Sequence, residues 1–403
     1  MTSNEVDIIP EFAIIWVIYC PNFMKSIYIP QKQLNNLKNS VKPGKVVILY
    51  GPRRVGKTTL VKKFLENVKE PNIYLNGEDI FVQENLSSQS IVKLKDFIGR
   101  AKVVVIDEAH KIPNIGLNLK LIVDNIKNVK IIATGSASFE LVQKMGEPLT
   151  GRKFTLKLFP LAQLELSQYE NLYETQSNLE KRLIFGSYPE VVLSESNDER
   201  ILYLKELVNS YLLKDILEIN GIRHSDKLIK ILRLLAFQTG NEISYSEIAA
   251  QVGINKKTLE NYLDLLEKVF VIFKLGGFSR NLRKEVSKSK KYYFYDLGIR
   301  NAIINNFNLL ELRDDTGCLW ENYIISERIK KQEYEGMHVN SYFWRTYDQE
   351  EIDLIEERGG KLSAYEIKWS GGRILPPDDF INAYASAKFE VISRENYLKF
   401  INS

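Results

Sequence analysis

Cysteine and histidine are scarce in this chain of 403 residues, which contains two cysteines and three histidines. Cys20 and Cys318 lie far apart in the sequence, and no CxxC motif occurs. Zinc fingers and zinc enzymes built on Cys and His ligands are therefore not expected. The low cysteine content is typical of a reducing compartment, and we expect a cytoplasmic protein.

The chain also lacks an apolar run of membrane-spanning length near its start. Residues 12–20 are apolar, but a spanning helix needs about twenty such residues. Acidic residues, and no Lys or Arg, precede this segment, so neither a secretory signal nor a membrane partner is expected. Met24 opens a segment typical of a natural start. We expect residues 1–23 to be a non-structural extension, with a peripheral strand or helix as the alternative.

A large excess of one charge is missing as well. The chain has 55 Lys and Arg against 51 Asp and Glu, for a formal net charge of +4, which does not by itself indicate nucleic-acid binding. Its 44% hydrophobic and 26% charged residues exclude a largely disordered or fibrous chain. The length suggests two or three domains of about 150 residues each.

Short apolar runs alternate with helix-length segments in the first third of the chain. These runs, rich in β-branched residues, are at 46–50, 72–75, 103–106 and 130–134. The pattern predicts an α/β fold with a parallel sheet and helices on both of its faces.

A complete GxxxxGK[ST] motif follows the first of these runs and precedes an amphipathic helix. Its glycines allow backbone amides to surround phosphates at a helix N-terminus. Lys57 is expected to contact the β- and γ-phosphates, and the Thr58 hydroxyl is expected to bind Mg²⁺. The expected nucleotide-binding residues are Gly51, Pro52, Arg53, Arg54, Val55, Gly56, Lys57, Thr58 and Thr59.

Two later runs end in polar residues suited to nucleotide hydrolysis. Asp107 is expected to hold Mg²⁺ through its water shell, and Glu108 is expected to polarise the attacking water. If the run at 130–134 lies between the other two strands, Thr134 or Ser136 would face the γ-phosphate. Turn formation is the alternative role of this Thr-Gly-Ser string.

Four strings, GPRRVGKTT, VVVIDEAHKIP, IIATGSAS and LTGRKFTLKLFPL, resemble a large prokaryotic group of AAA-type ATPases. In that group the ATPase is fused to a C-terminal domain of unknown function, and the resemblance covers about residues 24–400. It implies binding and hydrolysis of ATP with Mg²⁺. It also implies that Arg152 is an arginine finger on a neighbouring subunit of a homo-oligomer, with a surface arginine as the alternative. Arg53 or Arg54 could serve instead, or contact DNA.

The resemblance and the helical pattern together divide the first part of the chain. We expect a P-loop ATPase core at 24–160 and a helical lid or connector at 161–240.

Residues 241–300 have the pattern of a winged helix. Residues 246–266 show helix-turn-helix spacing, with Gly253 in the turn. A predicted hairpin follows, and its run at 280–291 contains six basic residues and one acidic residue. This basic wing favours DNA as a partner over a protein. Acidic residues on the second helix, such as Glu260 and Asp264, argue against sequence-specific recognition.

Residues 301–403 are predicted to form a small α/β domain. Asp353 lies on one predicted strand, and Glu366 and Lys368 share a face of the next. Two carboxylates and a lysine so placed can hold Mg²⁺ and promote phosphodiester cleavage. The pattern resembles the PD-(D/E)xK restriction-endonuclease superfamily, which implies an upstream helical acid, here Glu321. The alternatives are a fold kept for DNA binding alone and a solvated ion pair.

These features are consistent with two main functions, and with a chaperone-like remodeller as a third. One is an ATP-driven, DNA-associated motor or switch with a nuclease-like C-terminal domain. The alternative is a nucleotide-dependent regulatory or signalling switch with a protein partner and no nuclease activity.

Overall fold

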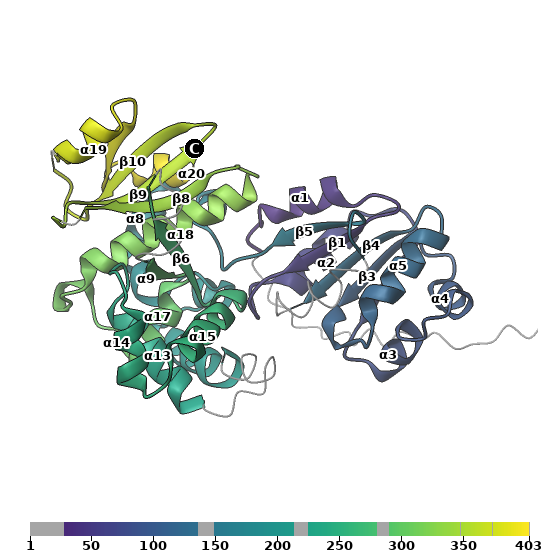
Figure 1. Ribbon diagram of the computed structural model, residues 1–403. Coiled ribbons are helices and arrows are strands. Elements are labelled where there is room, and N and C mark those ends of the chain that lie inside the picture. Colours follow the sequence, from purple (N-terminus) through teal and green to yellow (C-terminus); the bar gives the residue numbers. More distant parts are fainter. Residues whose placement is uncertain are drawn as a thin grey trace, which may run out of the picture.

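The computed structural model describes residues 28–135, 149–212, 225–279, 290–346, 348–372 and 374–402. These residues form two lobes, each built around one sheet (Figure 1). The predicted extension at 1–23 lies outside the described residues, as does Ser136.

The first lobe contains a five-stranded parallel sheet. Its strands are β1 (Val46–Tyr50), β2 (Asn72–Asn76), β3 (Val103–Asp107), β4 (Lys130–Gly135) and β5 (Lys153–Lys157). Their order is β2-β3-β4-β1-β5, so β4 separates β1 from β3 as expected. Every residue of β1 and β3 is buried, which explains their continuous runs of Val, Ile and Leu.

Among the described residues, five α-helices accompany this sheet. They are α1 (Gln33–Ser40), α2 (Lys57–Leu65), α3 (Ile80–Leu86), α4 (Ile91–Ile98) and α5 (Ile115–Asn125), with a short 3₁₀ helix η1 (Ala109–Lys111). The carboxyl ends of the parallel strands meet at one edge of the sheet, and the motif of residues 51–58 follows β1 at that edge.

The region from 161 to 240 is mostly helical in its described residues, 161–212 and 225–240, as the sequence predicts. Its helices are α7 (Gln163–Leu166), α8 (Leu172–Ser177), α9 (Leu179–Phe185), α10 (Pro189–Leu193), α11 (Asn197–Glu206), η2 (Leu207–Leu212) and α13 (Ser225–Phe237). Asn171 and Ser196 cap two of them, each paired with a glutamate three residues later. Helices α9 and α13 contact α17 (Leu297–Ile304), so this region belongs to the second lobe (Figure 1).

The helix-turn-helix elements are present where the sequence places them. Helices α14 (Tyr245–Val252) and α15 (Lys256–Lys268) flank Gly253, whose φ of +72° suits a glycine turn. Strands β6 (Ile272–Gly277) and β7 (Lys290–Phe294) then pair antiparallel. Most of the basic run between these strands, residues 280–289, lies outside the described residues.

The second sheet crosses the boundary that we expected near residue 300. It adds β8 (Asn340–Arg345), β9 (Glu351–Arg358), β10 (Lys361–Ile367) and β11 (Lys388–Ile392) in the order β11-β10-β9-β8-β6-β7. Gly276 and Gly277 of β6 pair in parallel with Tyr342 and Phe343 of β8. The hairpin of the helix-turn-helix region and the C-terminal strands therefore share one sheet.

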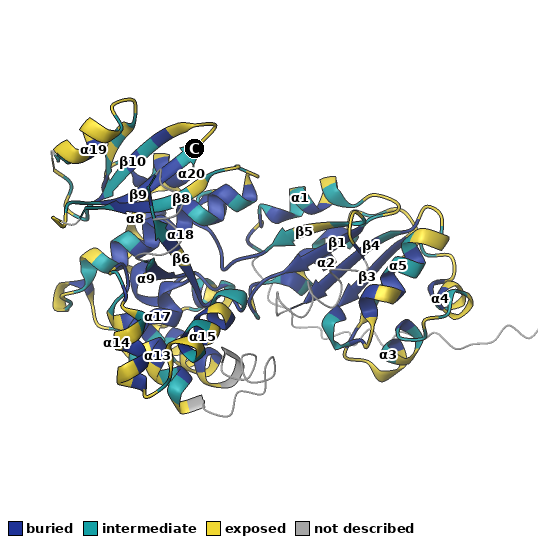
Figure 2. Ribbon diagram, viewed as in Figure 1, coloured by how far each residue is buried: buried dark blue, intermediate teal, exposed yellow. Residues whose placement is uncertain are grey.

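Helix α18 (Thr316–Tyr334) connects this sheet to the first lobe. At its end, the Tyr334 hydroxyl accepts a hydrogen bond from the Phe159 N–H at 3.0 Å. Lys157 of β5 is 2.8 Å from the carboxylate of Glu333. Thirteen of the nineteen residues of α18 are buried (Figure 2). The short helices η3 (Leu310–Leu312), α19 (Asp378–Ala383) and α20 (Tyr397–Asn402) complete the lobe.

None of the described helices combines the length and the apolar character that a membrane crossing requires.

Candidate functional site

The phosphate-binding loop is fixed by a close contact with the end of β5. A Cβ atom added at Gly51 would lie 1.9 Å from the carbonyl oxygen of Leu158, so only glycine fits there. Gly56 has a φ of +95°, which also favours glycine. The Gln31 side chain donates to the Val55 carbonyl at 2.9 Å and supports the loop from outside the motif.

Lys57 is buried at the first position of α2, with an exposed fraction of 5%. Its ammonium donates to the carbonyl oxygens of Gly51 at 3.0 Å and Pro52 at 2.7 Å. The predicted phosphate-binding lysine is therefore held inside the curve of the loop, at the N-terminus of the helix.

Asp107 accepts hydrogen bonds from three hydroxyl groups. The Thr58 hydroxyl donates to its Oδ2 at 2.7 Å, and the Tyr74 hydroxyl donates to the same oxygen at 2.5 Å. The Thr134 hydroxyl donates to Oδ1. The structure thus brings together the two predicted Mg²⁺ ligands, Thr58 and Asp107. Hydroxyl and carboxylate oxygens are the donors that Mg²⁺ prefers, so this pair fits the ion.

Glu108 adopts a left-handed conformation immediately after β3, with a φ of +50°. Its N–H donates to the Thr134 hydroxyl at 3.2 Å, and its carboxylate lies 3.3 Å from His110 Nδ1. Burial raises the pKa of this carboxyl above its ordinary value, while the charge of Lys57 opposes the shift. A carboxylate with a raised pKa is a better base for activating water.

The remaining side chains of the motif have different surroundings, and one of them reaches the second lobe. The Arg54 guanidinium is 3.6 Å from Glu190 of α10, and its central carbon is 5.5 Å from the ring centroid of Tyr203 of α11. Arg53 lies near Glu108, where its charge lowers the pKa of that carboxyl. Thr59 is exposed on α2.

Arg152 lies away from the phosphate-binding loop of its own chain. It directly precedes β5, and its carbonyl oxygen accepts from the N–H of Val46 at the start of β1. Its side chain pairs with Asp124 at 2.6 Å. Because the loop follows the opposite end of β1, an arginine finger at this position would act only on another subunit.

A second cluster forms on β9 and β10, where the sequence predicts it. Lys368 Nζ is 2.7 Å from Glu366 Oε1 and 3.7 Å from Asp353 Oδ2. The Ile367 N–H donates to Asp353 Oδ2 at 2.8 Å. Gly359 and Gly360, both at positive φ, form the tight turn that aligns the strands. Burial raises the pKa of both carboxyls.

Glu321 of α18 joins this cluster from the helix side. The Tyr293 hydroxyl donates to it at 2.6 Å, and burial with the nearby Asp353 charge raises its pKa to about 7. Lys291 lies 3.7 Å from Glu321 and forms an ion pair with Glu351. Lys291 was expected on the exposed basic wing, but it is only 1% exposed. It therefore neutralises the carboxylate cluster and does not face solvent.

The donor set of this second cluster is small. Within the described part of the chain, no three or more His, Cys, Asp or Glu side chains are arranged to hold a metal ion. Asp353 and Glu366 are thus at most a two-carboxylate set. Such a pair fits Mg²⁺, which keeps several of its waters and binds through one or two carboxylates.

The sequence did not reveal several supporting residues. Tyr74 and Tyr293 belong to strands, where buried tyrosines are usually core residues, and neither is part of a motif. Gln31 precedes the motif by twenty residues, and no local pattern connects the two.

Three family models match successive parts of the chain. Residues 43–167 match an AAA domain. Residues 176–310 match a domain of unknown function (DUF8612), and residues 316–390 match another (DUF4143). The first match confirms the AAA-type part of the resemblance, and the descriptions of the other two name no activity.

The chain is also similar in sequence to proteins of two other organisms. The chain is 25% identical to an uncharacterized protein of Mycobacterium tuberculosis over 335 residues, covering 82% of this chain and 72% of that protein. It is 28% identical to an uncharacterized protein of Methanocaldococcus jannaschii over 325 residues, covering 73% and 71%.

Two solved structures are also similar. The Walker-type ATPase of Pyrococcus abyssi matches with a TM-score of 0.46 and 18% identity, covering 70% of this chain and 97% of that one. The RuvB Holliday junction branch migration motor of Thermotoga maritima matches with a TM-score of 0.30 and 15% identity, covering 61% and 89%. The family match, together with the loop and the Asp107 network, identifies an AAA-type P-loop domain at residues 43–167.

Proposed function

We propose that this chain binds and hydrolyses ATP in its first lobe. The observation that carries this proposal is the hydrogen bond from Thr58 to Asp107, with Lys57 held in the loop beside them. Thr58 and Asp107 would hold Mg²⁺, which neutralises phosphate charge when bound. Lys57 would contact the β- and γ-phosphates, and Glu108 would accept the proton of the attacking water.

The second lobe is proposed to act on DNA. The cluster of Asp353, Glu366 and Lys368 supports a nuclease-like site, because its two carboxylates and lysine lie within ion-pair distance on adjacent strands. The helix-turn-helix elements and the adjoining hairpin support a winged-helix contact with the DNA backbone. DNA cleavage would use the two carboxylates as metal ligands and Lys368 to stabilise developing negative charge.

A protein partner is the second candidate, because α15 is not a basic surface. Its Glu260 pairs with Lys257 at 3.7 Å, and its Asp264 pairs with Lys268 at 2.5 Å. A helix that balances its own charges attracts phosphates weakly. In this alternative the nucleotide state regulates contact with a protein, and no cleavage occurs.

ATP turnover with and without DNA tests these proposals. Single-stranded, duplex and branched DNA are compared, with Lys57→Ala as the blank. Stimulation of turnover by one DNA form supports a working DNA ligand and identifies the preferred structure. Basal turnover that no DNA changes across a range of salt concentrations would favour the protein-partner function.

Cleavage is tested separately with the DNA form that stimulates turnover. Asp353→Asn should abolish Mg²⁺-dependent nicking. Glu357→Gln, which removes a carboxylate from the same strand outside the cluster, should leave nicking unchanged. Equal nicking by Asp353→Asn and the unmodified protein would assign the activity to a contaminant.

A further inference from the structure

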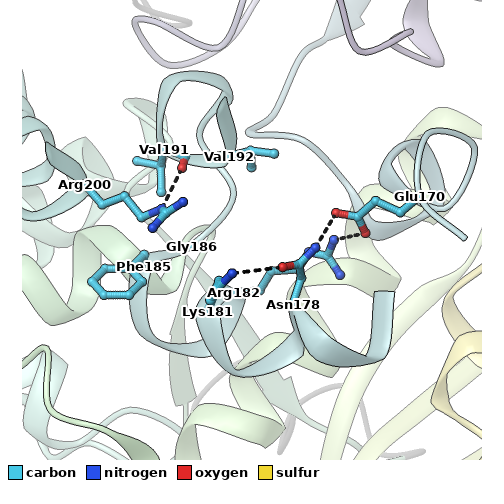
Figure 3. A pocket seen from close by; sticks show the side chains of 9 residues that line it. All are labelled: Glu170, Asn178, Lys181, Arg182, Phe185, Gly186, Val191, Val192 and Arg200. Atoms are coloured by element: carbon cyan, nitrogen blue, oxygen red, sulfur yellow. Dashed lines mark hydrogen bonds and ion pairs between the residues drawn. The ribbon is translucent and has the colours of Figure 1, made fainter. Parts of the chain in front are cut away.

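Two cavities lie beside helix α9, and they differ in what they can hold. The smaller, of about 60 Å³, is lined by Arg182, Glu170 and Arg200 among others (Figure 3). Its arginines already have partners, since Arg182 pairs with Glu170 and Arg200 donates to the Val191 carbonyl at 3.1 Å. The larger cavity, of about 370 Å³, falls within the range of about 300–1,000 Å³ typical of ligand pockets.

The larger cavity lies beside the segment that follows β10, next to Lys368 of the carboxylate cluster. Trp369 directly follows Lys368 and lines the cavity. The segment after β11 supplies Arg394, and α20 supplies Tyr397. The facing wall comes from α8 and α9, with Gln176, Leu179 and Glu180. The cavity therefore lies between the helical region and the C-terminal strands.

A planar cation covers the aromatic wall. The central carbon of the Arg394 guanidinium lies 4.5 Å from the ring centroid of Trp369, and Arg394 Nε donates to the Trp369 carbonyl at 3.2 Å. Trp369 in turn packs edge to face with the buried Trp320 at 5.4 Å. This hydrogen bond and packing hold the guanidinium and indole as a layered platform.

The charges around the cavity do not by themselves select an anion. Arg394 is the cation of the lining, and Glu180 and Glu395 add two carboxylates. An uncharged planar ring would stack on the Arg394–Trp369 platform, since bases stack on both aromatic rings and guanidinium planes. Carboxylates accept hydrogen bonds from the exocyclic amino groups of bases.

We propose that this cavity binds one unpaired nucleobase that carries an exocyclic amino group, such as cytosine or adenine. The base stacks on the Arg394 guanidinium, which the Trp369 ring supports from behind, and Glu180 accepts a hydrogen bond from the amino group of the base. Thymine has no such group and binds less well. This inference rests on the proposed function, because it requires a nucleic-acid strand that reaches the neighbouring Lys368 cluster.

Binding of labelled single-stranded oligonucleotides to the full chain tests this site. Fluorescence anisotropy is measured with EDTA and without ATP, so neither cleavage nor turnover contributes. Oligo(dC) and oligo(dA) should bind more tightly than oligo(dT). Arg394→Ala should weaken oligo(dC) binding about fivefold or more, since each stacked base contributes about 1–3 kcal/mol. Arg358→Ala removes the same charge from the exposed β9–β10 turn and should have a smaller effect.

Glu180→Gln provides the second variant. The glutamine has about the size of the glutamate, but its amide can donate hydrogen bonds as well as accept them. It can therefore pair with thymine too, so the preference for oligo(dC) over oligo(dT) should fall. Glu180 is exposed on α9, so this variant should fold normally. Equal effects of Arg394→Ala and Arg358→Ala, with no base preference, would overturn the proposal.

Competition by mononucleotides separates the two sources of the base. Displacement of the oligonucleotide by millimolar dCMP, lost in Arg394→Ala, supports a site that also accepts a free nucleotide. If dCMP does not displace the oligonucleotide, and Arg394→Ala still weakens oligonucleotide binding, the site takes a base at a strand end or a base extruded from a strand. A failure of DNA-stimulated ATP turnover or of nicking would be seen in its own assay and leaves this binding measurement unaffected.

Discussion

Arg54, in the phosphate-binding loop, lies 3.6 Å from Glu190 in the first turn of α10. The contact joins the loop that would hold the nucleotide to a helix of the second lobe. Both side chains are partly exposed, at 35% and 62%, so the pair adds little to stability. We predict that it transmits a change in the loop to the helical region.

The first prediction concerns this contact. Arg54→Ala removes the ion pair and the contact with the Tyr203 ring, so it should lower the free energy of unfolding by about 0.5–2 kcal/mol. It should also abolish the ATP-dependent change in amide hydrogen exchange over residues 189–206. Glu190→Gln should have the same effect, and Arg233→Ala, at an exposed position of α13, serves as the control. Persistence of the exchange difference in both variants would assign the coupling to other contacts.

The second prediction concerns the pH dependence of hydrolysis. Glu108 must be ionised to act as a base, so activity is present above its pKa and is lost as the pH falls through it. Burial raises this pKa above the ordinary value of 4.5, so the acid limb of kcat/KM should lie above pH 4.5. Glu108→Gln should retain ATP binding and lose turnover by about 10²–10⁴-fold.

Glu78→Gln provides a directional control for this profile. The negative charge of Glu78 contributes to the raised pKa of Glu108, and the side chain is exposed. Its removal should move the acid limb to lower pH without abolishing turnover. If the acid limb of kcat/KM has the same pH midpoint in Glu78→Gln as in the unmodified protein, the titrating group is not Glu108.

The sequence predicted those parts of the molecule whose residues are neighbours in the chain. Residues 51–58, Asp107 and Glu108 are defined by a motif and by the apolar strands before them. The pairing of Asp353 with Glu366 and Lys368 follows from strand alternation and a Gly-Gly turn. In each case local chemistry decides the geometry.

The remaining features depend on contacts between distant segments. The pairing of Gly276 with Tyr342 joins strands separated by more than sixty residues, and neither residue signals it. Lys291 belongs to a basic run, yet the shared sheet turns it toward Glu321 and Glu351. A count of charges along the sequence cannot distinguish a solvated lysine from one buried against two carboxylates.

The third prediction follows from this burial. Lys291→Met leaves Glu321 without its compensating cation and leaves Glu351 with only Arg345, 3.6 Å away, and should lower the free energy of unfolding by about 3–5 kcal/mol. Lys290→Met is the matched control. Its ammonium lies 5.4 Å from the Tyr245 ring centroid, an interaction of about 0.5–1 kcal/mol. Urea denaturation measures the free energy of unfolding of both variants.

A double variant separates the role of charge from that of packing. Glu351→Gln removes the direct partner of Lys291, so combining it with Lys291→Met should recover part of the lost stability. If the two effects simply add, the loss in Lys291→Met reflects packing and not an uncompensated carboxylate.

The fourth prediction uses two glycines to separate steric exclusion from backbone preference. At Gly44 a Cβ atom would meet nothing within 4 Å, but its φ is +70°, so Gly44→Ala should lower the free energy of unfolding by about 1–2 kcal/mol. At Gly51 a Cβ atom would lie 1.9 Å from the Leu158 carbonyl oxygen, which is backbone and cannot rotate away. Gly51→Ala must therefore separate the start of the loop from the end of β5. It should lower stability by about 3 kcal/mol or more.

The two variants should also differ in nucleotide binding. Gly44→Ala lies outside the loop and should bind ATP with unchanged affinity, whereas Gly51→Ala displaces the carbonyl that holds Lys57 and should bind at least tenfold more weakly. Isothermal titration at a temperature where both variants remain folded makes the comparison. Normal ATP affinity in Gly51→Ala would show that the loop tolerates the displacement, and that its contact with Leu158 supports the fold alone.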